Sequence, residues 1–255
     1  MDIDFGRTAA DYALYRRGYP VGLYDRLRAG YGIGAAGQRI VDLGTGTGAL
    51  ARGFAQRGAL VTGIDPAEAL LEQAERADRD SGVYVDYRAG RAEATGLPDA
   101  AADVVTAAQC WHWFDRPAAA AEARRLLVSG GQAAIVHFDW LPLPGTVVEA
   151  TEALILAHNP GWSMGGGTGF YPQWPGDLYA AGFGYIETFS FDVGVEFSPE
   201  AWRGRIRASA GVAASLDSDG VARFDAELAA LLARDFPQSP LRVPHRAWAV
   251  VARAP

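Results

Sequence analysis

Short apolar runs alternate with longer amphipathic segments between residues 39 and 138 of the chain. β-branched apolar runs are typical of buried strands, whereas apolar residues at helical spacing are typical of helices packed on one face. The predicted strands are 39–44, 59–65, 83–90, 102–109 and 132–138, and the predicted helices are 48–58, 66–80 and 117–127. Strands that alternate with helices of this length predict an α/β fold, with a mostly parallel sheet that carries helices on both faces.

Beyond His137 this alternation stops. A loop rich in glycine and aromatic residues follows a predicted helix at 146–157, and Ser198 and Pro199 have the residue types preferred at the cap and first position of another helix. The remaining predicted elements are strand 185–197, helix 220–236 and strand 245–253. We therefore expect a single domain, 1–255, whose core is formed by 35–138, 184–196 and 245–253 and whose cap or lid elements are 1–30, 139–183 and 197–240.

Composition narrows the possible chemistry. The 255 residues carry a net charge of −7, which argues against nucleic acid as a partner because phosphate binding needs clustered positive charge. All 23 basic residues are arginine, which excludes a catalytic lysine, and the single cysteine, Cys110, excludes an intramolecular disulfide. Neither a signal peptide nor an 18-residue apolar run is evident, so we expect a cytoplasmic protein without a membrane partner. The sequence leaves the oligomeric state open.

Three glycines at alternate positions follow the first predicted strand, in the stretch Val41 to Leu50, "VDLGTGTGAL". Glycine lets the backbone adopt unusual angles and approach a ligand closely, and this loop is a common ligand site in open α/β sheets. The spacing differs from the G-x-G-x-x-G of a dinucleotide site. Asp42 precedes the glycines, and its charge would repel a pyrophosphate but attract an ammonium or sulfonium group. A plain tight turn is the alternative.

Asp65 ends the second predicted strand, and Pro66 follows it at the expected first position of the next helix. A carboxylate at the end of this strand can accept hydrogen bonds from two ribose hydroxyls, which suits any ligand that contains adenosine. The alternative is a helix cap, since aspartate is a preferred capping residue. Taken alone, Asp65 does not separate a nicotinamide dinucleotide from S-adenosylmethionine.

Four motifs in order, "VDLGTGTG", "GIDPAEALLEQA", "GRAEATGLPDAAADVV" and "AAQCWHWFD", resemble those of the class I S-adenosylmethionine-dependent methyltransferases. More narrowly, the chain is similar to the type 11 group of small-molecule methyltransferases with an "HWFD" segment, such as trans-aconitate methyltransferase-like proteins. The resemblance covers roughly residues 1–138. It implies a Rossmann-like sheet of seven strands with a small helical cap, S-adenosylmethionine as cofactor and S-adenosylhomocysteine as product.

The resemblance also implies the residues of the cofactor site. They are Tyr12, Arg16, Asp42, Gly44, Thr45, Gly46, Asp65, Pro66, Ala92, Glu93 and Gln109. Gly44, Thr45 and Gly46 would pass under the methionine part, with Asp42 near its ammonium group.

At the other end of the cofactor, the resemblance implies that Asp65 would hold the ribose, with Pro66 against the adenine. Ala92 and Glu93 would meet the adenine, although Arg91 stands where family members often have aspartate.

The resemblance implies that Gln109 would lie near the sulfonium and its methyl group. Tyr12 and Arg16 would close over the cofactor and meet its carboxylate, unless they belong to a solvated helix packed on the sheet.

Methyl transfer to a poorly acidic group needs a general base. His112 in "QCWHWFD" is the candidate catalytic residue because a histidine titrates near neutral pH. The alternative is a structural role in packing the loop, which a segment shared by enzymes with different acceptors also suggests. His137, at the end of the fifth predicted strand, is the second candidate. The four histidines lack metal-ligand spacing, and we expect no metal.

The acceptor side is less defined. A flexible aromatic lid is one interpretation of Trp162, Phe170, Tyr171 and Trp174, and a structural loop is the other. Arg203 and Arg207, one helical turn apart, could bind a carboxylate or could be solvated. We expect methyl transfer to a small molecule, with oxygen as the preferred acceptor atom. The alternatives are an NAD(P)-dependent oxidoreductase and an S-adenosylmethionine-binding protein without methyl transfer.

Overall fold

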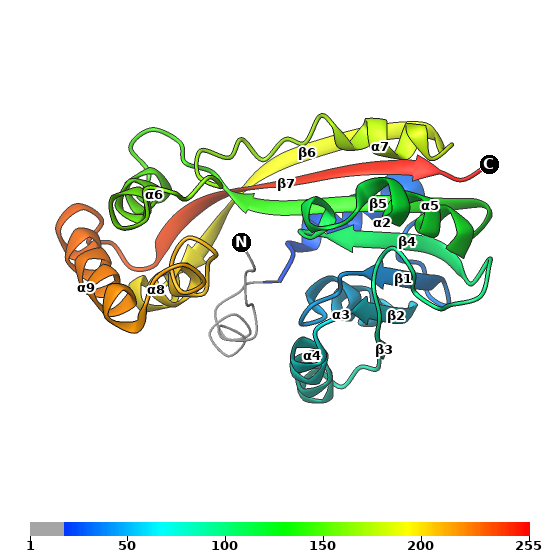
Figure 1. Cartoon of the computed structure of the whole chain (residues 1–255), viewed down its shortest axis with the longest axis horizontal. Coiled ribbons are helices and arrows are strands. Elements are labelled where there is room, and N and C mark those ends of the chain that lie inside the picture. The colour runs from blue at the N-terminus through cyan, green and yellow to red at the C-terminus, as the bar shows by residue number, and fades with distance from the viewer. Residues whose placement is uncertain (1–17) are drawn as a thin grey trace. The chain divides into compact units, whose positions relative to one another are not determined.

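The computed structural model describes residues 18–255, and these form a seven-stranded sheet in the order β3-β2-β1-β4-β5-β7-β6 (Figure 1). Its strands are β1 Arg39–Leu43, β2 Leu60–Asp65, β3 Asp86–Ala89, β4 Ala102–Ala108, β5 Leu127–Trp140, β6 Gly184–Phe197 and β7 Leu241–Arg253. The pairs β1–β2, β2–β3, β1–β4 and β4–β5 are all parallel. The strand order therefore reverses at β1, and the predicted α/β class with a mostly parallel, doubly wound sheet is confirmed.

The helices are α2 Val21–Tyr31, α3 Ala49–Ala55, α4 Glu68–Ser81, α5 Arg116–Leu126, α6 Val147–His158, α7 Trp174–Ala180, α8 Pro199–Arg207 and α9 Ser218–Asp235, with a short 3₁₀ turn, η2, at Trp111–Trp113. The helices that were predicted lie close to their expected positions, whereas α2 was not predicted. Ser198 caps α8 and Pro199 is its first residue, as predicted. The predicted start of the second helix at Pro66 is wrong, because α4 begins at Glu68 after its cap residue Ala67. Helix α7 was not expected from the glycine-rich sequence around it.

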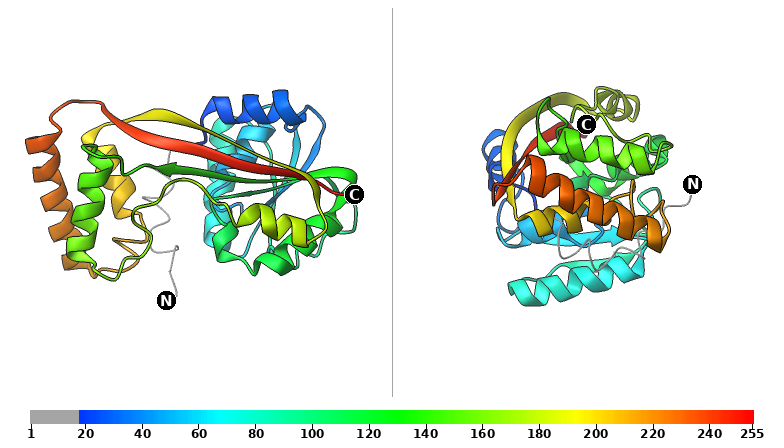
Figure 2. Two further views of the ribbon diagram at one scale, coloured as in Figure 1. Left: turned by 90° about the horizontal axis from the view of Figure 1, so that it is seen from above. Right: turned by 90° about the vertical axis from the view of Figure 1, so that its left-hand side faces the viewer.

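The chain divides into two compact units. Among the described residues, the unit that we name the sheet unit comprises 18–138, 171–190 and 247–255, and the cap unit comprises 139–170 and 191–246. The long strands β5, β6 and β7, seen also in Figure 2, each contribute residues to both units. The bounds differ from the expected core and cap, since α2 and α7 belong to the sheet unit.

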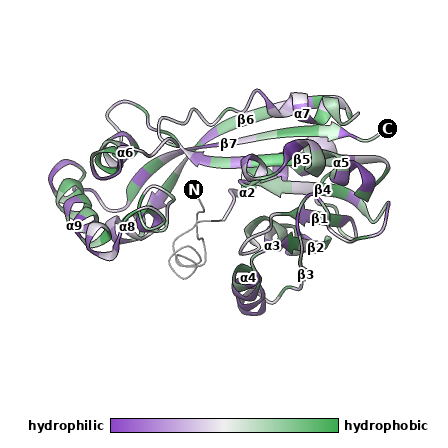
Figure 3. Cartoon of the chain, in the orientation of Figure 1, coloured by the Kyte–Doolittle hydropathy of each residue, from purple (hydrophilic) through white to green (hydrophobic). Residues whose placement is uncertain are grey.

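Each unit has its own apolar core. In the sheet unit, the buried faces of β1, β4 and β5 pack against small side chains of α5 such as Ala119 and Ala123. In the cap unit, Phe224, Leu228 and Leu232 form a stripe at four-residue spacing on α9 and join Trp202 of α8. The polar remainder of α9 is visible beside this stripe in Figure 3. Among the described residues, no helix combines the length and apolar character needed to cross a membrane.

Candidate functional site

The glycine loop connects β1 to α3 at the carboxyl edge of the sheet. The Thr45 amide donates to the Ile64 carbonyl at 3.0 Å, which ties the loop to the end of β2. Gly44 and Gly46 both have positive φ, +62° and +55°. A Cβ on Gly44 would lie 2.8 Å from both Cys110 Sγ and Phe114 Cζ, whereas a Cβ on Gly46 would meet no heavy atom of the described residues within 4 Å. Gly44 therefore serves internal packing, and Gly46 borders open space.

Asp42 lies inside this loop, with only 1% of its surface exposed. Its Oδ1 accepts from the Thr106 hydroxyl at 2.6 Å and its Oδ2 accepts from the Thr45 hydroxyl at 2.7 Å. Burial raises the pKa of Asp42 from 3.8 to about 6, although both hydroxyls oppose the shift. The group is thus mainly ionised at pH 7, and it places a negative charge beneath the loop, with Thr45 as its immediate neighbour.

Asp65 joins the glycine loop to the start of α4. Its Oδ2 accepts from the Gly46 amide at 2.8 Å, and its Oδ1 accepts from the Ala67 amide at 2.9 Å. The side chain is 7% exposed, and burial raises its pKa while the two amides oppose the shift. Asp65 thus bonds the amide of Ala67, the cap residue of α4, but it is not itself the cap that the alternative interpretation expected. Each carboxylate oxygen has two lone pairs, so both oxygens can still accept a ligand hydroxyl. Pro66 is exposed beside it.

Ala92 and Glu93 follow β3. Ala92 is buried, and Glu93 is partly buried. Glu93 Oε1 accepts from the amide of Asp115 at 3.0 Å, and its Oε2 lies 3.4 Å from Arg91 Nε. Glu93 is therefore fixed to the cap residue of α5, a contact that the sequence did not predict. If the Glu93 carboxylate also contacts adenine, as predicted, it does so while it accepts from the amide of Asp115.

Gln109 follows β4 in the left-handed backbone region, with φ of +57°. Strain of this kind in a residue other than glycine persists only where neighbouring contacts enforce it, and it is frequent at functional sites. The Gln109 amide donates to the Val136 carbonyl at 2.9 Å, and its Nε2 donates to the Phe138 carbonyl at 2.5 Å. These two bonds to β5 hold the turn that leads into η2.

His112 and His137 come together at the carboxyl ends of β4 and β5, with ring centroids 5.5 Å apart. His112 is exposed and lies 4.5 Å from the ring of Trp113. His137 is only 3% exposed, and its ring packs 4.1 Å from Tyr171 and 4.6 Å from Trp174. The sequence placed both histidines on the ligand edge of the sheet but did not show that they are neighbours.

This arrangement can be compared with known proteins. Residues 41–135 match the family model described as a methyltransferase domain. An uncharacterized methyltransferase of Mycobacterium tuberculosis is 34% identical over 136 residues, which are 53% of this chain and 52% of the relative. A ubiquinone biosynthesis O-methyltransferase of Pseudomonas aeruginosa is 44% identical over 102 residues, which are 39% of this chain and 44% of the relative. The chain thus spans about half the length of the curated relatives that it matches, or less.

Two solved structures share the fold. A candidate type II methyltransferase of Anaeromyxobacter dehalogenans has 26% sequence identity and a TM-score of 0.61, over 94% of this chain and 97% of the other. A candidate methyltransferase from an antibiotic biosynthesis pathway of Anabaena variabilis has 18% identity and a TM-score of 0.65, over 91% and 98%. These two likenesses show that the chain shares the fold of these proteins.

Nine of the predicted cofactor residues lie within residues 41–135, which match the family model, as does His112. Tyr12 and Arg16 lie outside the described residues. The two tryptophans on either side of His112 differ in exposure. Trp111 is buried and donates through Nε1 to Asp177 Oδ2 at 3.0 Å, whereas Trp113 is 46% exposed.

Two predictions for the acceptor side need correction. Trp174 cannot be part of a mobile lid, because it is 1% exposed and stacks on Tyr171 at 4.0 Å in the core of the sheet unit. Arg203 and Arg207 do bind a carboxylate, but it is that of Asp225 on α9, which Arg203 contacts through both Nε and Nη2. The pattern of two arginines was visible in the sequence, whereas their partner 18 residues or more away was not.

Proposed function

We propose that this protein transfers a methyl group from S-adenosylmethionine to a small-molecule acceptor, with oxygen as the preferred acceptor atom. The observation that carries the proposal is the junction of Gly46 and Asp65. The described residues leave open space beside Gly46, a buried carboxylate accepts from its amide, and both residues lie in the stretch that matches the methyltransferase family model. A Cβ at Gly46 would fill that space, so the loop fits a ligand that approaches the backbone closely.

Charge supports a cationic methyl donor at this place. Asp42 is ionised at pH 7 beneath the loop, and Asp65 lies at its edge. A pyrophosphate would meet two carboxylates here, whereas a sulfonium or ammonium group is stabilised by them. Asp65 would accept the ribose hydroxyls, and Gln109 would border the sulfonium. The Ala92 and Glu93 segment, with Pro66, would enclose the adenine.

The bound donor supplies a methyl group on a sulfonium, which is a good leaving group. The acceptor oxygen forms a bond to the methyl carbon as the carbon–sulfur bond breaks, and S-adenosylhomocysteine leaves. His112 accepts the proton of the acceptor hydroxyl, so no charge is left on the product. Much of the rate comes from alignment of the two reactants and exclusion of water. A carboxylate acceptor would not require the base.

The choice of acceptor rests on two observations. The exposed ring of Trp113 lies beside His112, which favours an acceptor with an aromatic part. The Pseudomonas relative is named as an O-methyltransferase, which favours oxygen as the acceptor atom. The HWFD segment supports a place near the trans-aconitate methyltransferase-like proteins, and the net charge of −7 disfavours nucleic acid.

Calorimetric titration with S-adenosylmethionine, S-adenosylhomocysteine and NAD tests the cofactor. We expect micromolar binding of both adenosyl ligands and none of NAD. Binding of NAD alone would identify an oxidoreductase and contradict the proposal. Formation of S-adenosylhomocysteine in the presence of phenols, catechols and carboxylic acids then tests transfer. Binding of the donor without turnover on any of these acceptors would contradict O-methylation and favour a binding protein.

A further inference from the structure

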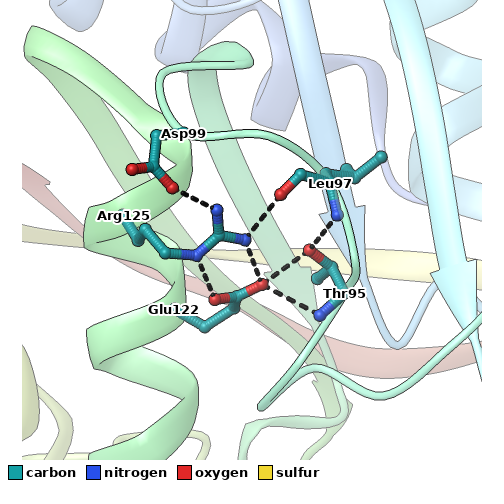
Figure 4. Close-up of polar contacts among 5 residues, drawn as sticks. All are labelled: Thr95, Leu97, Asp99, Glu122 and Arg125. Carbon is teal, nitrogen blue, oxygen red and sulfur yellow. Dashed lines mark hydrogen bonds and ion pairs between the residues drawn. The ribbon is translucent and has the colours of Figure 1, made fainter.

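Helix α5 carries a polar network that the proposed reaction does not use. Its residues contact the segment that follows β3 in the same order in which both run along the chain (Figure 4). At the start of α5, the amide of the cap residue Asp115 donates to Glu93. At its end, Glu122 contacts Thr95, and Arg125 contacts Leu97. The segment is thus bound to both ends of the helix.

Glu122 is the centre of this network. Its Oε1 accepts from the amide of Thr95 at 2.9 Å, from the Thr95 hydroxyl at 2.6 Å and from Arg125 Nη2 at 2.7 Å. Its Oε2 accepts from Arg125 Nε at 2.7 Å. Arg125, with Thr95, lowers the pKa of the buried Glu122 to about 2. The carboxylate is therefore ionised and fully engaged at any working pH.

Arg125 extends the network to the end of the segment. Its Nη2 also donates to the Leu97 carbonyl at 2.8 Å, and its Nη1 donates to Asp99 at 2.5 Å. The Arg125 carbonyl accepts from the amide of Ala100 at 3.1 Å. The Thr95 hydroxyl accepts from the amide of Leu97 at 3.2 Å. Charge-assisted and bidentate bonds of this kind fix geometry more strongly than neutral ones.

The segment needs such a support because residues 90–100 lie outside the strands of the sheet. An isolated bridge between Arg91 and Ala94 shapes its turn. The side-chain hydrogen bonds from α5 therefore take the place of the backbone hydrogen bonds that a strand would form with its neighbours in the sheet. Ala92 and Glu93 lie three and two residues before Thr95, the first residue that Glu122 binds.

We propose that Glu122 and Arg125 are positioning residues for base recognition. By binding Thr95 and Leu97 to α5, they hold the backbone of Ala92 and Glu93 in the position where it contacts the adenine of the donor. The inference rests on the proposed function. Neither residue touches the ligand, and both act through Thr95 and Leu97. Loss of the network should therefore reduce discrimination between bases more than it reduces affinity for the rest of the molecule.

The test compares S-adenosylhomocysteine with S-inosylhomocysteine, in which an oxygen replaces the 6-amino group of the base. Both are titrated calorimetrically into the wild-type protein, Glu122→Gln and Thr95→Val. Glu122→Gln keeps the shape but removes the charge, and Thr95→Val leaves the Glu122–Arg125 pair intact, so one variant remains informative if the other does not fold. Asp103→Asn is the control, because it breaks a bidentate pair with Arg39 and leaves the bonds of Glu122 and Thr95 in place.

We expect the wild-type protein to prefer the adenine ligand at least tenfold, which corresponds to about 1.4 kcal/mol. Each network variant should reduce this preference to about threefold or less, and Asp103→Asn should retain it. A wild-type preference preserved in both network variants, whatever their melting temperatures, would overturn the inference, and so would a wild-type protein that binds both ligands equally. A wild-type protein that binds neither ligand would instead refute the proposed function on which the inference rests.

Discussion

Substitution of Gly44 by alanine tests the packing of the glycine loop directly. Gly44 has φ of +62°, and an added Cβ would lie 2.8 Å from both Cys110 Sγ and Phe114 Cζ. The left-handed backbone costs an alanine about 1–2 kcal/mol, and forcing a methyl group into a packed site costs about 1–3 kcal/mol more. We therefore expect Gly44→Ala to lower the free energy of unfolding by about 2–5 kcal/mol.

Gly46→Ala is the matched control for this substitution. Its φ of +55° imposes the same backbone cost, but within the described part of the chain nothing lies within 4 Å of the added Cβ. The expected loss is then the backbone cost alone, about 1–2 kcal/mol. The entropy that each alanine removes from the unfolded chain is equal and cancels in the comparison. The difference between the two variants isolates the contact with Cys110 and Phe114.

Thermal unfolding followed by circular dichroism measures both variants. At about 2–4 °C per kcal/mol for a chain of this size, Gly44→Ala should lower Tm by about 4–20 °C and Gly46→Ala by about 2–8 °C. Titration with S-adenosylhomocysteine should show the reverse order, with affinity lost in Gly46→Ala and retained in folded Gly44→Ala. A Gly44→Ala variant no less stable than Gly46→Ala would refute the assignment of Gly44 to packing.

Three further predictions concern titratable groups of the site. Folding raises the pKa of Asp42 from 3.8 to about 6, so the folded protein binds this proton more tightly than the unfolded chain. The contribution of Asp42 to stability therefore falls by about 3 kcal/mol as the pH rises from about 4 to about 6. Asp42→Asn should remove this fall, as measured by denaturant titrations between pH 4 and 8. The pKa of His245 is lowered to about 4, so its contribution to stability changes with pH in the opposite direction, but this contribution cancels in the difference between variant and wild type. An equal dependence of stability on pH in both proteins would contradict the burial argument. Asp65→Ala should weaken S-adenosylhomocysteine binding at least tenfold in calorimetry, and unchanged affinity would remove Asp65 from the site. His112→Ala should reduce turnover about 10²-fold with cofactor affinity intact, and unchanged turnover would exclude it as the base.

The local parts of the fold could be predicted from the sequence. Alternation of apolar runs with amphipathic segments determined the strands β1 to β5 and their helices, because periodicity reflects which side of each element is buried. Ser198 and Pro199 marked the start of α8 by their own backbone chemistry. The second helix was placed two residues too early, since Pro66 suits a first helical position but Asp65 accepts from the amide of Ala67.

Contacts between residues far apart in the chain could not be predicted in this way. The sequence left Trp174 open between a mobile lid and a structural loop, and it packs on His137, 37 positions earlier. Arg203 and Arg207 were interpreted as ligand-binding or solvated, and both form ion pairs with Asp225. In each case the partner lies on another element, and residue type alone does not reveal which element that is.

The sequence by itself therefore determined the α/β class, the glycine loop and the residue types at the carboxyl edge of the sheet. Only the tertiary structure decided how the three-dimensional site uses them: Gly44 faces Cys110 while Gly46 borders open space, and Glu93 bonds the start of α5. The physical reason is that local propensity acts over a few residues along the chain. Burial, charge pairing and open space depend instead on which strands and helices the folded chain brings side by side.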